Sequence, residues 1–460
     1  MINSPPEGQV INLWQRLLAH RTELTTEAGE PIKIIYPGRI NAEQGADFRD
    51  AVIATNQGLM KGDIEVHAKS SSWRAHRHHR NPVYNQVVLH VVIWHDTKAA
   101  TKLQNGDGIP TLALYRYITD PLNQRLRTAK PPVSLSKPCL NATERLTPGI
   151  VAEFLDNAGK ERFLTKATEF QVDLAQMEAS QCLYQGTMGA LGYSQNKLPF
   201  LELAHRVPLR ILESITRNEI SDEGCLSQLQ ALLLGTAGLL PSQRRDRVPE
   251  NKIDDEWLYK LEQLWASYHP AETMSREDWH LFRVRPNNSP IRRIAAMSYL
   301  LLRYRESGLF DGVIKMITEV PVNKSHRRLE TGLAVTTNGY WASHFDFGLA
   351  SKVRNPTLLG SGRAADITIN VLLPLTCAWS KLISQPELEK KTLNLFRRYP
   401  KLTVNTIERH MKNQLGVSSS LLNSAQRQQG LIQIYNTLCT QGRCSCCPLS
   451  QLETGNHVQI

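Results

Sequence analysis

The sequence predicts an α+β protein in which an N-terminal α/β domain precedes a mostly α-helical C-terminal region. Short β-type runs separated by Gly, Asn and Pro fill the front of the chain, whereas apolar residues recur at helical intervals after residue 150. The 460 residues are about three times a common domain length, and 41% of them are hydrophobic. We therefore expect an α/β domain over 1–127, a linker over 128–149, and helical domains over 150–285 and 286–460.

The front of the chain is expected to hold one helix and then several strands. Leu13, Trp14, Leu17 and Leu18 have helical spacing within 10–18. The β-type runs that follow lie at 32–36, 51–54, 63–67, 87–94 and 111–115. The Gly, Asn and Pro residues between them predict turns.

Four prolines interrupt a polar stretch at positions 131, 132, 138 and 148, which predicts the linker. In the rear region, apolar residues recur every three or four positions. The resulting expected helices lie around 154–174, 226–233, 257–265 and 431–438.

Positive charge is in excess, and it is unevenly distributed. The chain has 54 Lys and Arg against 43 Asp and Glu, a formal charge of +11, and residues 281–330 hold ten basic against four acidic residues. Such clustering favours nucleic acid as a partner. The expected contacts are Arg283, Arg285, Arg292 and Arg293. A solvated helix face is the alternative interpretation.

No membrane contact is expected, because no apolar run approaches the roughly 18 residues of a membrane helix. The N-terminus has neither a basic segment nor an apolar core typical of a secretory signal. We therefore expect a cytoplasmic protein.

Ionisable residues alternate along the strand expected at 63–67 and just beyond it. Glu65, His67 and Lys69 would share one face of that strand, because successive side chains point to opposite faces. Buried charge requires a partner, and a divalent cation held by Glu65 and by Asp47 near the neighbouring strand would provide one. The arrangement resembles the core of PD-(D/E)XK nucleases, which have a restriction-endonuclease-like fold. That resemblance implies Mg²⁺ or Mn²⁺ on Asp47 and Glu65, with His67 or Lys69 assisting catalysis. His67 stands where those enzymes have Lys.

Histidines are concentrated in the same region. Six of the fourteen lie within 67–95. His76, His78 and His79, together with Arg39, are expected to contact phosphate. A zinc- or manganese-dependent hydrolase built from Glu65, His67, His76 and His78 is one alternative. Hydrogen-bonded core histidines beside a solvated turn are another.

Cysteines crowd near the end of the chain. Cys439, Cys444 and Cys447 have a spacing that could bind one Zn²⁺ or an iron–sulfur cluster. The stretch 443–449 resembles the cluster loop of endonuclease III-type DNA glycosylases, although its fourth Cys is missing. Cys377 or His457 could supply the fourth ligand. Reduced thiols packed in the core are the alternative.

Several runs together resemble the uncharacterised bacterial family named domain of unknown function 2851. They lie at 37–41, 45–48, 62–67, 73–79, 89–92, 234–239, 283–286, 363–366 and 443–448. Ser72 and Asn81 stand where Asp is expected in that family, so neither is given a catalytic role. The family implies no activity.

From the residues we expect a metal-dependent nuclease or phosphodiesterase acting on nucleic acid. A non-catalytic nucleic-acid- or partner-binding protein with a nuclease-like fold is the first alternative. A zinc hydrolase using the histidines is the second.

Overall fold

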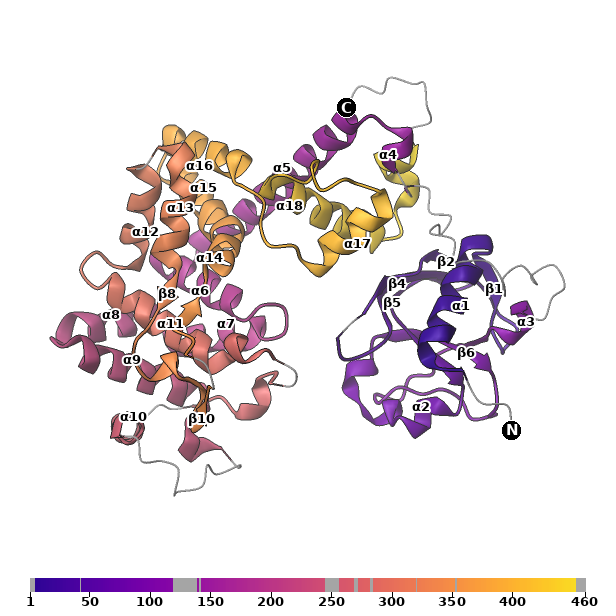
Figure 1. The fold of residues 1–460 in the computed structure, drawn as a ribbon, viewed down its shortest axis with the longest axis horizontal. Helices are drawn as coiled ribbons and strands as arrows, with labels where there is room; N and C mark the ends of the chain where they lie inside the picture. The colour runs from indigo at the N-terminus through magenta and orange to yellow at the C-terminus, as the bar shows by residue number, and fades with distance from the viewer. Residues whose placement is uncertain are drawn as a thin grey trace. The chain divides into compact units, whose positions relative to one another are not determined.

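The protein was analysed as a computed structural model, in which two compact units are distinguished (Figure 1). The first unit combines residues 1–159 with 404–423 and 427–460, and the second comprises 160–403 with 424–426. The structure describes residues 5–41, 43–118, 139, 142–244, 256–268, 272–281, 284–319, 321–351 and 354–451. The predicted α/β front and mostly helical remainder are confirmed.

A seven-stranded mixed sheet forms the front of the first unit. Its members are β1 (Glu23–Thr25), β2 (Pro31–Tyr36), β3 (Arg39–Ile40), β4 (Phe48–Thr55), β5 (Gly58–Lys69), β6 (Val87–Trp94) and β7 (Thr111–Ala113). The strand order is β1-β2-β4-β5-β6-β7, with β3 paired to β4. The pairs up to β4–β5 are antiparallel, whereas β5–β6 and β6–β7 are parallel. All the strands expected from the sequence are present, although the last ends at Ala113.

The helix expected near the N-terminus is α1 (Glu7–His20), and it packs on one face of the sheet (Figure 1). Trp14 of α1 lies in one core cluster with Ile64 and Val66 of β5 and with Leu89 of β6. The second half of β5, from Asp63 to Ala68, is buried throughout, as is usual for a strand with a parallel neighbour. Gly62 precedes this stretch, where a Cβ atom would collide with the backbone of Gln86.

The other side of the sheet is covered by short elements. They are α2 (Ser72–Ala75), η1 (His78–Arg80) and η2 (Pro82–Tyr84), which lie between β5 and β6 in the chain. The short helix α3 (Tyr115–Ile118) follows β7, and its Tyr117 belongs to the core cluster of α1. Trp73 of α2 is 1% exposed and forms a small core with Ala46, Val87 and Leu103.

The first unit is completed by segments from the middle and the end of the chain. They are α4 (Ala142–Arg145), the start of α5 (Pro148–Leu174), α17 (Thr406–Leu415), α18 (Ala425–Ile434), η10 (Tyr435–Cys439), η11 (Cys444–Cys446) and α19 (Pro448–Gln451). Their core includes Leu155 of α5 and Tyr435, and it extends to Tyr36 and Val52 of the sheet.

The second unit is mainly helical. Its helices are the rest of α5, α6 (Ala179–Leu191), α7 (Lys197–Arg206), α8 (Leu209–Asn218), α9 (Asp222–Thr236), α10 (Glu256–Ser267), α11 (Pro290–Arg303), α12 (Leu309–Thr318), α13 (Val322–Leu333), α14 (Ser361–Ile367), α15 (Leu373–Leu382) and α16 (Pro386–Arg398). A π-helical turn, η9 (Thr368–Leu372), joins α14 to α15. Short strands β8 (Val335–Thr336), β9 (His344–Asp346), β10 (Leu349–Ala350) and β11 (Thr357–Leu359) form two hairpin-like pairs.

The expected linker over 128–149 falls largely outside the described residues, and its described part contains α4 and the start of α5. The division into segments at 127, 150 and 286 stays a prediction. The last part of the chain belongs to the same compact unit as the first 159 residues. None of the described helices combines the length and the apolar character that a membrane span requires.

Candidate metal centre on the sheet of the first unit

Two parallel strands bring three ionisable side chains together. Glu65 and His67 alternate with Ile64 and Val66 along β5, and His90 of β6 is the register partner of Glu65. The apolar residues of β5 face α1, so strand alternation places Glu65 and His67 on the opposite side. Glu65 is 6% exposed, His67 1% and His90 0%. The expected shared face of Glu65 and His67 is therefore a buried one.

The segment after β5 folds back over this face. Asp96 accepts hydrogen bonds from the backbone amide and hydroxyl of Ser71 and from the hydroxyl of Ser70, which fixes the start of α2. Trp73 then anchors α2 by donating its indole N–H to the carbonyl oxygen of Lys102. Arg77 adopts φ +61°, in the left-handed region that non-glycine residues rarely occupy. This turn allows His76 and His78, on either side of Arg77, to face the same point.

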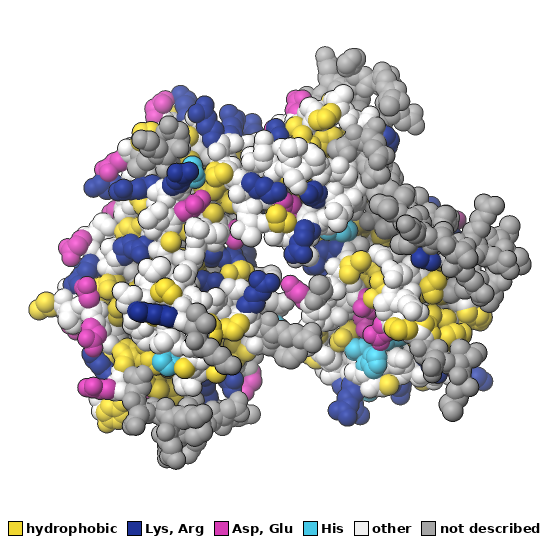
Figure 2. All heavy atoms as spheres, in the orientation of Figure 1, with side chains coloured by type: hydrophobic (Ala, Val, Ile, Leu, Met, Phe, Trp, Pro, Cys, Tyr) yellow, Lys and Arg dark blue, Asp and Glu magenta, His cyan; other side chains and the backbone are white. Residues whose placement is uncertain are grey.

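Three imidazole nitrogens converge there. His67 Nε2 lies 3.1 Å from His76 Nδ1 and 3.3 Å from His78 Nε2. Among the residues that the structure describes, these three form the one group of three or more metal-ligating atoms lying within 4.8 Å of one another. Figure 2 shows histidine side chains beside acidic side chains on this part of the surface.

Two carboxylates border the imidazoles. Glu65 Oε1 is 3.2 Å from His78 Nε2 and 3.5 Å from His67 Nε2. Glu7 Oε1, from the first turn of α1, is 3.7 Å from His76 Nδ1 and 3.9 Å from His67 Nε2. His67 Nε2 is thus surrounded by four potential ligand atoms, from β5, from α1, from the residue that follows α2 and from η1.

A second layer of polar groups holds His67. Its Nδ1 is 2.9 Å from His90 Nε2, and His90 Nδ1 is 3.3 Å from the hydroxyl of Thr101, which is 3.0 Å from that of Thr111. If His67 Nδ1–H donates to His90 and His90 Nδ1–H donates to Thr101, every donor has an acceptor. His67 Nε2 is then unprotonated and directs its lone pair at the cluster. A metal ligand needs this tautomer.

Asp47 is held beside Glu65 by backbone contacts. Its amide donates to Glu65 Oε2 at 3.1 Å, and its Oδ2 accepts from the amide of Val66 at 2.9 Å. The loop before it is fixed by Asn41, whose side-chain amide donates to the carbonyl oxygen of Ala46 and whose backbone amide donates to that of Asp47. The structure therefore brings together Asp47 and Glu65, as the sequence reasoning required.

Burial controls the charge of these groups. It raises the pKa of Glu65 to about 8, although the Asp47 amide opposes this shift. Burial and the nearby charge of Glu65 raise the pKa of Asp47 to about 7. Burial and the neighbouring imidazole of His90 lower the pKa of His67 to about 2, and burial lowers that of His90 to about 3. Burial therefore disfavours the charged forms of His67 and His90 and of the carboxyl groups of Glu65 and Asp47. A bound cation would stabilise the ionised carboxylates.

Three other predicted residues of the front domain lie outside this group of nitrogens. Lys69 is exposed at the end of β5. Arg39 pairs through Nε with Asp50 at 3.3 Å. His79 is not among the converging atoms, although its neighbour His78 is. His78 is 7% exposed and its ring lies 3.8 Å from that of Tyr84, so it belongs to the buried cluster rather than to a solvated loop.

The arginines expected to bind nucleic acid differ in their exposure to solvent. Arg283 lies outside the described residues. Arg285 is exposed and lines a cavity of about 390 Å³ with Phe345. Arg292 and Arg293 are 1% and 5% exposed.

The structure corrects the expectation for Arg292 and Arg293. Arg292 donates to the carbonyl oxygens of four residues, which are Trp341, His344, Asn355 and Thr357. Arg293 donates to the carbonyl oxygen of Leu358, to the hydroxyl of Tyr193 and to Asn288. Both guanidinium groups therefore fix irregular backbone inside the second unit and are not available to phosphate.

The cysteines near the end of the chain differ in burial. Cys439 and Cys447 are buried, Cys444 is half-buried and Cys446 is exposed. Their sulfur atoms form no group of three within 4.8 Å among the described residues, and Cys377 is not grouped with them. His457, the other expected ligand, lies outside the described residues. A metal at Cys439, Cys444 and Cys447 stays a prediction.

Two residues of the cluster were not predicted. Glu7 lies in the first helix, and no local pattern connects it to β5. His90 was expected only as a hydrogen-bonded core histidine, in the alternative interpretation, and was given no role beside a metal. Its signal was available, because a histidine inside the otherwise apolar run 87–94 requires a buried partner.

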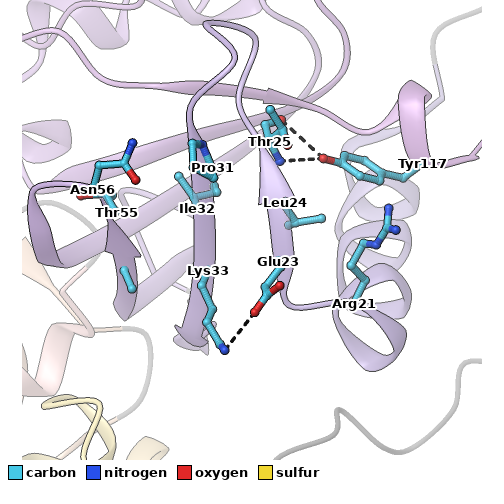
Figure 3. A pocket seen from close by; sticks show the side chains of 11 residues that line it. Arg21, Glu23, Leu24, Thr25, Pro31, Ile32, Lys33, Thr55, Asn56 and Tyr117 are labelled. Carbon is cyan, nitrogen blue, oxygen red and sulfur yellow. Dashed lines mark hydrogen bonds and ion pairs between the residues drawn. The ribbon is translucent and has the colours of Figure 1, made fainter.

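The first unit has a second hollow away from these residues. A cavity of about 540 Å³ lies at β1 and β2, where Lys33 pairs with Glu23 and the hydroxyl of Tyr117 accepts from the amide of Thr25 (Figure 3). It offers one carboxylate and no histidine, so we place the candidate chemistry at the histidine cluster instead.

The comparisons with known proteins show to which family the chain belongs. No curated protein and no solved structure matches the chain. The model of the family described as protein of unknown function (DUF2851) matches residues 7–403, which include the sheet, the histidine cluster and nearly all of the second unit. The resemblance of the front domain to a nuclease core stays a prediction. The resemblance to the DUF2851 family is confirmed over residues 7–403, and the chain belongs to that family.

Proposed function

We propose that the protein is a metal-dependent hydrolase of phosphodiester bonds in nucleic acid. The observation that carries the proposal is the convergence of His67, His76 and His78 with Glu65. In this proposal those four residues hold one divalent ion, Glu7 borders it, and Asp47 orients Glu65.

The spacing of the donor atoms suits a single ion. Ligands about 2.0–2.1 Å from a tetrahedral metal are about 3.3 Å apart. The separations from His67 Nε2 to His76, His78 and Glu65 are 3.1, 3.3 and 3.5 Å. Three imidazoles with carboxylates favour Mn²⁺ or Zn²⁺ over Mg²⁺, which prefers oxygen ligands.

A bound ion would supply charge neutralisation for phosphate oxygens and a lower pKa for coordinated water. The protein residues would supply position and proton transfer. Beside a cation the pKa of Asp47 falls below its metal-free value of about 7, so Asp47 would be ionised and able to accept a proton from an attacking water. Lys69, exposed at the end of the same strand, would contact the phosphate.

Nucleic acid is the proposed substrate because the chain carries a formal charge of +11. A zinc-dependent hydrolase acting on another substrate is the second candidate. The observation that favours it is the three-imidazole donor set, which is typical of catalytic zinc.

The test uses full-length protein stripped with EDTA and reloaded separately with Mn²⁺, Zn²⁺ or Mg²⁺. Single- and double-stranded DNA and RNA are the substrates, and Glu65→Gln is compared with wild type. We expect metal-dependent cleavage that falls by about 10²-fold or more in Glu65→Gln, as on removal of a group that stabilises the transition state. His95→Ala is the matched control, since it removes an exposed histidine of the same unit that lies outside the cluster.

If wild type and Glu65→Gln cleave equally, or neither cleaves with any ion, the nuclease proposal fails. If neither cleaves but wild type binds one zinc ion that His78→Ala loses, the second candidate replaces it.

A further inference from the structure

A second group of charged residues lies in the helical unit, where α6 and α14 pack against η9 and Phe170 of α5 lies near Gly186 of α6. Its cations are Arg162, Lys166, Lys197, Arg293 and Arg363, and its acids are Glu169 and Asp366. Positive charge therefore exceeds negative charge in a region that is partly removed from solvent.

Arg363 and Lys166 are held in defined positions. The guanidinium carbon of Arg363 lies 3.2 Å from the centre of the Tyr193 ring, and its Nη1 is 3.4 Å from Asp366 Oδ2. The ammonium group of Lys166 donates to the side chain of Asn370 in η9. Tyr193 adopts φ +55°, so its backbone is strained where it presents the ring to Arg363.

The acids do not balance these cations. Asp366 is near both Arg363 and Lys166 and is 32% exposed, whereas Glu169 is fully on the surface of α5. Arg162 stands one turn before Lys166 on α5, where like charges repel each other. Arg363 is 14% exposed at its side chain, and its buried Nε has no hydrogen-bond acceptor among the described residues.

Partial burial costs Arg162, Lys166 and Arg363 part of their hydration, whereas Lys197 is exposed. Burial and the nearby charge of Arg162 lower the pKa of Lys166 to about 7, and burial lowers that of Arg363. An anion with several oxygens would restore the balance. Planar guanidinium groups pair well with phosphate oxygens, and a lysine adds a point charge.

We propose that Arg363 and Lys166, together with the neighbouring Arg162 and Lys197, form a phosphate-binding site in the second unit. The site is independent of the proposed metal centre. The phosphate could belong to a nucleic-acid backbone or to a small phosphorylated compound, and both sources share the same chemistry.

The test titrates full-length, EDTA-treated protein with inorganic phosphate by calorimetry, at an ionic strength kept constant with chloride. We expect saturable binding that Lys166→Met and Arg363→Gln each weaken by about tenfold or more, as on loss of a charge-assisted hydrogen bond. Lys160→Gln is the matched control, because Lys160 is an exposed cation on the same helix. Should Arg363→Gln fail to fold, Arg363→Lys, which keeps the charge and loses the planar group, takes its place.

Absence of phosphate binding by wild type overturns the proposal, and so does binding that all the variants retain. The Glu65→Gln variant should bind phosphate as wild type does, so failure of the metal centre and failure of this site are separable. A short oligothymidylate identifies the source. Competition with phosphate that depends on Lys166 indicates a nucleic-acid backbone, whereas phosphate binding without such competition indicates a small phosphorylated compound.

Discussion

The metal-free protein should lose stability as the pH rises, and Glu65 should be the main reason. The pKa of Glu65 in the folded protein is about 8, against an ordinary value of 4.5. Between these values the unfolded chain releases the proton and the folded chain retains it. The folded state therefore binds more protons, and the free energy of unfolding falls as the pH rises through this interval.

The size of the effect follows from the shift. One pKa unit is worth about 1.4 kcal/mol, so Glu65 accounts for roughly 4 kcal/mol between about pH 5 and about pH 8. Glu65 is 6% exposed, so solvent screens little of this amount. Asp47 shifts in the same direction and titrates together with Glu65, so the two cannot be added as independent groups.

The substitution Glu65→Gln keeps an oxygen to accept from the Asp47 amide and removes the ionisation. Stability of EDTA-treated protein is measured by hydrogen exchange of the β5 and β6 amides, which reports opening of the sheet and not of the helical unit. We expect a falling profile for wild type and a much flatter one for Glu65→Gln. Glu30→Gln, at an exposed position in the β1–β2 turn, should follow wild type. Parallel profiles for wild type and Glu65→Gln would refute the reasoning.

Three further predictions concern other parts of the structure. His90→Ala should weaken divalent-metal binding by about 10–100-fold in chelator competition, because His67 loses the group that orients it; unchanged affinity would contradict this role. Arg292→Met should lower the free energy of unfolding, measured in urea, by about 3 kcal/mol or more, because several buried carbonyl groups lose their donor. The same substitution should leave the salt dependence of DNA binding unchanged. Gly62→Ala should destabilise the sheet by roughly 1–3 kcal/mol, because its methyl group meets the Gln86 carbonyl and the Val88 side chain; a melting temperature equal to that of wild type would show that the strand adjusts freely.

Much of the sheet could be predicted from local patterns. The β-type runs at 32–36, 63–67 and 87–94 became β2, β5 and β6, because β-branched residues bounded by turns favour strands. The strand period also placed Glu65 and His67 on one face. The alternation of side chains along a strand could not predict a long-range contact. Glu7 reaches His67 only after α1 has packed on the sheet, and nothing near Glu7 in the chain indicates this.

The errors have physical causes as well. A run of arginines predicts a phosphate-binding surface only if the side chains stay in solvent, and Arg292 and Arg293 instead satisfy buried carbonyl groups of the β8–β11 segment. Cysteine spacing, in turn, does not show how exposed each thiol is, since Cys446 is exposed and Cys444 is half-buried while Cys447 packs in the core.

The most direct test of the central claim is the metal content of the purified, full-length protein after dialysis against Mn²⁺ or Zn²⁺. The histidine cluster predicts one tightly held ion per chain, which His67→Ala and His78→Ala lose and His79→Ala retains. No bound ion in wild type, or an ion that His67→Ala retains, would contradict the assignment of His67, His76, His78 and Glu65 as a metal centre.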